Sequence, residues 1–162
     1  MNLNQIHNVY FIGIGGIGMS ALARYFQNIG KNVSGYDKTP TMLTDELIAG
    51  GMNIHFEDSI AAIPADYFVE NTLVIVTPAV PVSHSEWNYF LERDYEIKKR
   101  AEVLGLITKD TFCFAVAVTH GKTATSSILG HILYESGADV TAFLGGIVEN
   151  YHSNLIGSGK TI

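Results

Sequence analysis

Hydrophobic positions along the chain follow two alternating patterns. Short apolar runs with β-branched or aromatic residues predict strands at residues 8–12, 32–35, 73–76 and 112–118. Apolar residues spaced three and four apart predict helices between these runs, at residues 18–27, 42–49, 85–93 and 101–107. Strands that alternate with helices of about ten residues are typical of parallel βαβ units. We therefore expect an α/β fold with a Rossmann-like, doubly wound parallel sheet.

The same pattern indicates a domain junction near residue 108. A short helical segment ends within residues 105–111, and a new strand begins there. The chain then offers one helix at residues 123–135, one strand at residues 140–144 and a tail rich in glycine and asparagine. These elements are too few to close a second core. We therefore predict a first domain at residues 1–107 and the incomplete beginning of a P-loop ATPase domain at residues 108–162.

Composition narrows the class of protein. The 162 residues are 47% hydrophobic, yet no apolar run approaches the roughly 20 residues of a membrane span. The N-terminus lacks the basic region of a secretory signal, and the single cysteine, Cys113, lies in an apolar run where we expect it to be buried. The formal charge of −6 argues against nonspecific nucleic-acid binding. We expect a cytoplasmic protein with a small-molecule ligand and no nucleic-acid or membrane partner.

The first predicted strand runs directly into a glycine-rich turn, GIGGIGMS. Gly13, Gly15 and Gly18 fit the GxGxxG spacing, in which the first glycine permits a tight turn, the second admits a pyrophosphate and the third allows helix and strand to pack closely. Asp37 ends the next strand, where a carboxylate can accept hydrogen bonds from ribose hydroxyls. A turn that serves packing alone, and a solvated aspartate, remain alternatives.

A proline-containing loop follows the strand at residues 73–76. Its residues are Thr77, Pro78, Ala79, Val80 and Pro81. In parallel sheets of this class, ligands bind outside the carboxyl ends of the strands. The loop is therefore either a binding loop or a purely structural turn.

A second phosphate loop is predicted at THGKT, after the apolar run at residues 112–118. In such a loop Lys122 reaches the β- and γ-phosphates, Gly121 presents its N–H group, and the Thr123 hydroxyl binds magnesium. The full GxxxxGK[ST] spacing is absent, and a chance G-K-T in a surface turn is the alternative. His120 is either a ligand or general base, or a residue that orients the loop backbone or contacts a base. The other five histidines show no metal-ligand spacing.

Taken together, the two phosphate loops and their surroundings resemble the N-terminal part of Mur ligases. The resemblance covers essentially all 162 residues and rests on VYFIGIGGIGMSALA, VSGYD, VTPAV, KRAEVLGL and AVAVTHGKTATSS. It implies a ligase of peptidoglycan synthesis that joins L-alanine to UDP-N-acetylmuramate through an acyl phosphate. The cofactors that it implies are ATP and Mg²⁺, bound by a central domain, while the first domain binds the UDP portion of the substrate.

The resemblance also implies roles for particular residues. For the UDP-sugar it implies Gly13, Ile14, Gly15, Gly16, Ile17, Gly18, Met19, Ser20, Asp37, Thr77, Pro78, Ala79 and Val80. For ATP it implies Thr119, His120, Gly121, Lys122 and Thr123, with Lys122 acting in catalysis by neutralising charge and Thr123 holding Mg²⁺. We expect the chain alone to bind the UDP-sugar without catalysing ligation.

Two positions depart from the family pattern GTHGKTT. Val118 replaces its first glycine, so we expect the side chain to crowd the phosphate or to exclude a glycine-type dihedral. Ala124 replaces its last threonine and removes a hydroxyl donor that is worth about 1 kcal/mol. The family's acidic magnesium-binding strand would lie beyond Ile162.

Two other function classes remain as alternatives. An NAD(P)-binding oxidoreductase domain would explain the first glycine turn and Asp37, but it leaves THGKT unexplained. A noncatalytic nucleotide-sensing module would suit the altered second loop.

Overall fold

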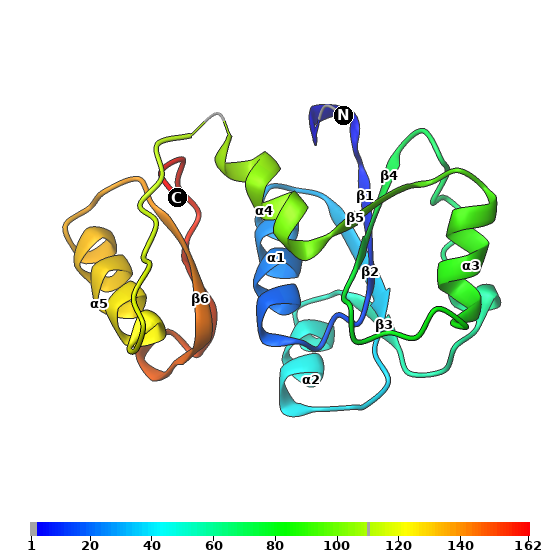
Figure 1. Ribbon diagram of the computed structural model, residues 1–162, viewed down its shortest axis with the longest axis horizontal. Coiled ribbons are helices and arrows are strands. Elements are labelled where there is room, and N and C mark those ends of the chain that lie inside the picture. The colour runs from blue at the N-terminus through cyan, green and yellow to red at the C-terminus, as the bar shows by residue number, and fades with distance from the viewer. Residues whose placement is uncertain (1–2, 110) are drawn as a thin grey trace.

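A parallel sheet forms the centre of the larger part of the molecule (Figure 1). The computed structural model describes residues 3–109 and 111–162. The strands are β1 (Asn8–Ile12), β2 (Asn32–Tyr36), β3 (Asn53–His55), β4 (Thr72–Val76) and β5 (Glu96–Lys99). All neighbours are parallel, in the order β3-β2-β1-β4-β5. This order places the carboxyl ends of β1, β2 and β4 beside one another.

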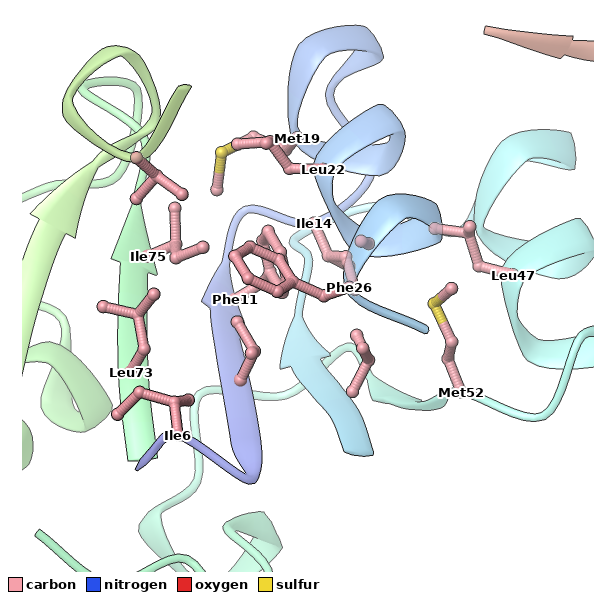
Figure 2. Packing of buried hydrophobic residues seen from close by; sticks show 14 of the residues in the cluster. Ile6, Phe11, Ile14, Met19, Leu22, Phe26, Leu47, Met52, Leu73 and Ile75 are labelled. Carbon is pink, nitrogen blue, oxygen red and sulfur yellow. The ribbon is translucent and has the colours of Figure 1, made fainter. Parts of the chain in front are cut away.

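Helices cover both faces of this sheet, because alternate side chains of the buried strands point to opposite sides. The helices are α1 (Ile17–Asn28), α2 (Met42–Ala49), α3 (Ser85–Glu92) and α4 (Arg100–Thr108). On one face Phe11 of β1 packs with Phe26 of α1, in a cluster that α2 and α4 complete (Figure 2). On the other face Tyr10 packs against Phe90 of α3. The predicted doubly wound sheet is confirmed.

A smaller part follows α4. It contains α5 (Lys122–Glu135) and an antiparallel hairpin of β6 (Thr141–Val148) and β7 (Ser153–Gly157). Short 3-10 turns lie at Leu3–Gln5, Ile60–Ala62 and Glu149–Tyr151. The hairpin lies against α1, on the side of that helix away from the sheet (Figure 1). Buried Asn154 joins the two parts, because its Nδ2 donates to the Ile17 carbonyl at 2.5 Å and to Ser20 Oγ at 2.8 Å.

The prediction of a strand at residues 112–118 is wrong. This segment is extended, but its described backbone hydrogen bonds are two with Ile162: Phe114 N donates to the Ile162 carbonyl at 2.8 Å, and Ile162 N donates to the Phe112 carbonyl at 3.0 Å. A strand needs a continuous ladder, and one facing residue does not provide it. For the same reason Cys113 is exposed rather than buried.

Three strands, β3, β5 and β7, are additional to the predicted set. Two of them, β3 and β5, are the edges of the sheet, and their three or four residues are mostly polar. Edge strands of this length carry no hydrophobic run that a sequence pattern could reveal. No helix in the two described ranges is both long and apolar enough to cross a membrane.

Candidate functional site

The glycine turn after β1 is held by the end of β2. The N–H groups of Gly13 and Ile14 both donate to the Tyr36 carbonyl, at 2.7 and 3.0 Å. Gly13 has φ +91°, and a Cβ there would lie 2.3 Å from Cγ2 of Thr77 in the loop after β4. The first glycine of the motif is therefore required by both its dihedral and its neighbour. It allows the loops after β1, β2 and β4 to meet.

Asp37 lies where the sequence places it, at the end of β2 beside this turn. Its Oδ2 accepts the Gly15 N–H at 2.7 Å, and its Oδ1 accepts the Thr39 N–H at 3.1 Å. A carboxylate has about four lone-pair positions, so acceptor capacity remains for a ligand. Asp37 is half-buried and lines the cavity described below.

Gly18 lies directly against the side chain of Arg100. A Cβ at this position would lie 2.9 Å from Cδ, 3.0 Å from Nη1 and 3.1 Å from Nε of Arg100. Arg100 is the first residue of α4, directly after β5, so the sheet brings its guanidinium to the first turn of α1. The expected role of the third glycine, close helix–strand packing, stays a prediction. The same first turn presents backbone N–H groups that favour an anion.

A cavity of about 570 Å³ opens at the carboxyl edge of the sheet. Its lining residues from the predicted site are Gly13, Gly15, Gly16, Asp37, Thr77, Ala79 and Val80. Sequence reasoning missed the other lining residues, which are Tyr36, Lys38, Asp58, Pro81, Ser83 and His84. Tyr36 is the last residue of β2 and the others come from loops after β2, β3 and β4, so their proximity depends on the strand order. The sequence pattern does not predict this proximity.

Not all predicted residues line this cavity. Ile14, Met19 and Ser20 are buried in the fold, and they support the turn and α1. Ile17 and Gly18 line a neighbouring cavity of about 360 Å³, together with Arg100 and Gly145 of β6. Pro78 shapes the loop between Thr77 and Val80, where Val80 N donates to the Thr77 carbonyl at 3.2 Å.

A polar network lies behind the cavity wall. Glu86 of α3 is fully buried and accepts from Tyr10 Oη at 2.7 Å and from the Ser59 N–H at 3.0 Å, while its other contact is His55 Nε2 at 2.7 Å. Burial, reinforced by the negative charge of Glu86, raises the pKa of the Tyr10 hydroxyl. Tyr10 is therefore a neutral donor at physiological pH.

Asp58 joins this network to the cavity and caps the start of α3. It accepts the N–H groups of Ser85 at 2.9 Å and Glu86 at 3.2 Å, and it also accepts the Ser85 hydroxyl. Burial alone would raise the pKa of Asp58, but these hydrogen bonds outweigh it and hold the pKa below its usual value. Asp58 is therefore ionised at neutral pH.

The second loop, THGKT, begins α5. Gly121 is its N-cap and has φ +80°, while Lys122 folds back so that Nζ donates to the Val118 carbonyl at 2.8 Å. Among the described non-glycine residues, Asp94 and His152 have positive φ, so Val118 occupies its place without a glycine-type dihedral. The expected crowding of a phosphate by the Val118 side chain stays a prediction. The Val118 side chain is 42% exposed.

The residues of this loop fit a phosphate ligand. Lys122 is the first residue of α5, its Nζ lies at the Val118 carbonyl at the start of the loop, and the first turn of α5 has backbone N–H groups that favour an anion. Thr123 faces β6, since a Cβ at Gly145 would lie 3.0 Å from its Oγ1. Thr119 and His120 are exposed at the loop surface. Across the described parts of the chain, no three His, Cys, Asp or Glu residues cluster as metal ligands. Such a cluster is not needed for a magnesium ion that is held mainly by phosphates, because that ion takes few protein ligands.

Comparison with known proteins gives consistent matches. A family model described as "Mur ligase family, catalytic domain" matches residues 8–111. UDP-N-acetylmuramate–L-alanine ligases of Flavobacterium psychrophilum and Flavobacterium johnsoniae are 85% and 80% identical over 162 residues. These matches cover 100% of this chain and 36% of each relative.

Solved structures agree with these sequence matches. The UDP-N-acetylmuramate-alanine ligase MurC of Thermotoga maritima has a TM-score of 0.80 at 34% identity, covering 95% of this chain and 36% of that one. A murein peptide ligase of Psychrobacter arcticus has a TM-score of 0.75 at 28% identity, covering 86% and 29%. These proteins are ligases, so the oxidoreductase alternative is not favoured. The chain spans about a third of the length of these relatives, and it belongs to the Mur ligase family.

Proposed function

We propose that this chain is the N-terminal part of a UDP-N-acetylmuramate:L-alanine ligase and that its cavity binds the uridine diphosphate portion of the sugar nucleotide. The observation that carries the proposal is the meeting of the glycine turn, Asp37 and the Thr77 loop around one cavity of about 570 Å³. Such a position, outside the carboxyl ends of parallel strands, is where ligands of this fold class bind. The 85% identity to a ligase of that name supports the choice of substrate.

The proposed binding mode follows the charges along this cavity and the neighbouring cavity that Arg100 lines. The N–H groups at the start of α1 and the guanidinium of Arg100 bind the pyrophosphate, because both place positive charge at the same first turn. Asp37 accepts hydrogen bonds from the ribose hydroxyls. The loop from Thr77 to Val80 closes the cavity on the side of β4.

For the second loop we propose ATP binding with Mg²⁺. When bound, Mg-ATP supplies the phosphoryl group that activates the muramyl carboxylate. Lys122 would exchange the Val118 carbonyl for a phosphate and neutralise its charge, and the Thr123 hydroxyl would be a ligand of the metal. Thr119, His120 and Gly121 shape the loop, and His120 has no assigned catalytic step.

Ligation itself is proposed for the whole protein. No residue described above is assigned to L-alanine, and the relatives are almost three times as long as the matched part. We propose that residues 1–107 form the sugar-nucleotide domain and that residues 108–162 begin the ATP domain. A cytoplasmic location, without nucleic-acid or membrane partners, remains part of the proposal.

Calorimetric titration tests this function. We expect UDP-N-acetylmuramate and UDP to bind, and NAD not to bind. Asp37→Ala and Arg100→Ala should weaken UDP binding, whereas His131→Phe, on exposed α5, should leave it unchanged. Tight NAD binding with no response to either uridine nucleotide would overturn the proposal.

A further inference from the structure

His84 is a buried side chain in the cavity wall with unmet hydrogen-bonding capacity. It lies directly before α3 and is 5% exposed, and it lines the cavity. Both ring nitrogens are buried, and neither makes a hydrogen bond within the described structure. Buried polar atoms are usually paired, so an unpaired one calls for an explanation such as a ligand.

Two contacts hold the His84 ring in place. The Tyr36 ring lies against it, with centroids 4.4 Å apart and planes at 59°. The ring atom Nδ1 lies 3.3 Å from Oδ1 of Asp58, a contact within ion-pair distance but outside hydrogen-bond geometry. A neutral imidazole carries its proton on the nitrogen that faces a carboxylate. Nε2 is then the nitrogen with a free lone pair.

The position of His84 along the cavity indicates which part of a nucleotide it meets. The glycine turn and α1 mark the phosphate end, and Asp37 marks the ribose. Asp58 and His84 lie on the loops after β3 and β4, and the charge of Asp58 repels phosphate. The remaining uncharged part of a nucleotide is the base.

We propose that His84 reads the base and selects uracil, with Nε2 accepting the hydrogen on uracil N3. Cytosine has no hydrogen on N3 and presents a lone pair there, so it leaves the His84 lone pair unmatched. The inference depends on the proposed uridine nucleotide site and adds the residue that gives base specificity. The negative charge of Asp58, 3.3 Å from Nδ1, favours the tautomer that carries its proton on Nδ1.

The UDP-to-CDP affinity ratio of the full chain tests this inference. The two nucleotides share phosphate and ribose, so the ratio isolates the base. We expect the wild-type protein to prefer UDP by about tenfold, the value of one matched hydrogen bond. His84→Phe keeps a ring against Tyr36 but removes the acceptor, so the ratio should fall below about threefold while CDP affinity stays the same. His84→Gln restores an acceptor and should recover part of the preference.

The outcomes separate the two proposals. An unchanged ratio in His84→Phe, with UDP still bound, overturns the role of His84 and leaves the nucleotide site intact. Absence of binding of both UDP and CDP to the wild-type protein overturns the proposed function itself. His131→Phe, an exposed histidine of α5, is the matched control and should keep the wild-type ratio. Unaltered CDP affinity in His84→Phe excludes misfolding as the cause.

Discussion

Replacing Gly18 with alanine tests whether this glycine exists to admit Arg100. The new Cβ would lie 2.9–3.1 Å from three side-chain atoms of Arg100, and ordinary contact needs about 3.5 Å, so the guanidinium must move by roughly 0.5–1 Å. Displacing a flexible side chain costs about 0.5–1.5 kcal/mol, and alanine gains about 0.5–1 kcal/mol over glycine in a helix. We therefore expect the free energy of unfolding to change by less than about 1 kcal/mol.

Affinity for UDP should respond much more strongly. A hydrogen bond to a charged group is worth about 1.5–3 kcal/mol, and the exposure of Arg100 places its contribution near the lower end. Gly18→Ala should thus weaken UDP binding by roughly tenfold, as Arg100→Ala should. Because both changes remove one contact, the double variant should bind no more weakly than Arg100→Ala alone. Calorimetry with the four proteins measures this. Additive losses, or wild-type affinity in Gly18→Ala, would refute the reasoning.

Four further predictions concern stability and the second loop. Glu86→Ala leaves buried donors without their acceptor and should cost about 2–4 kcal/mol in urea denaturation; a loss below about 0.5 kcal/mol would contradict the network. Asn154→Ala removes the two hydrogen bonds to α1 and should cost about 1–2 kcal/mol, with amide exchange of β7 rising more than that of β1; equal increases in both strands would be inconsistent with a local role. Burial alone would raise the pKa of Asp58, but hydrogen bonds from α3 outweigh burial and hold the folded-state pKa below the unfolded-state value. The stabilising contribution of Asp58 is therefore present above the unfolded-state pKa and is lost as pH falls through the folded-state value. Acid titration of Asp58→Asn should therefore show less loss of stability below about pH 4 than the wild-type protein, and parallel curves would count against this. Val118→Gly should change ATP affinity less than twofold in the full chain, whereas Ala124→Thr should tighten it several-fold by restoring a donor; a large gain from Val118→Gly would show that its side chain obstructs the phosphate.

The local hydrophobic pattern was sufficient to predict the elements that carry a long apolar run or a clear helical spacing. The strand at residues 8–12 and the helix at residues 42–49 have the predicted bounds, because β1 is buried on both faces and α2 begins at a Thr41 cap. The extended segment around Cys113 shows the limit of the same rule. An apolar run becomes a strand only where neighbouring strands pair with it, and that depends on distant residues.

The residues of the candidate site also fall into two groups, those with a local sequence signature and those without one. Gly13 and Asp37 were predictable because a turn with a fixed dihedral and a strand end have local signatures. Arg100 and His84 were not predicted, since Arg100 reaches the neighbouring cavity and His84 the larger one only through the strand order that brings β5 beside β4 and β4 beside β1. Their importance depends on spatial neighbours, which a single sequence does not contain.

The hydrogen bonds of Asn154 have a thermodynamic consequence for the two phosphate loops. Its amide holds the hairpin to the first turn of α1, which is the same turn proposed to bind pyrophosphate, and Gly145 of that hairpin touches Thr123 of the second loop. A ligand that stabilises one conformation of this turn therefore also biases the position of the hairpin and, through it, of Thr123. Binding linkage is reciprocal: if a nucleotide at the first loop changes the nucleotide affinity of the second loop by some factor, a nucleotide at the second loop changes the affinity of the first loop by the same factor.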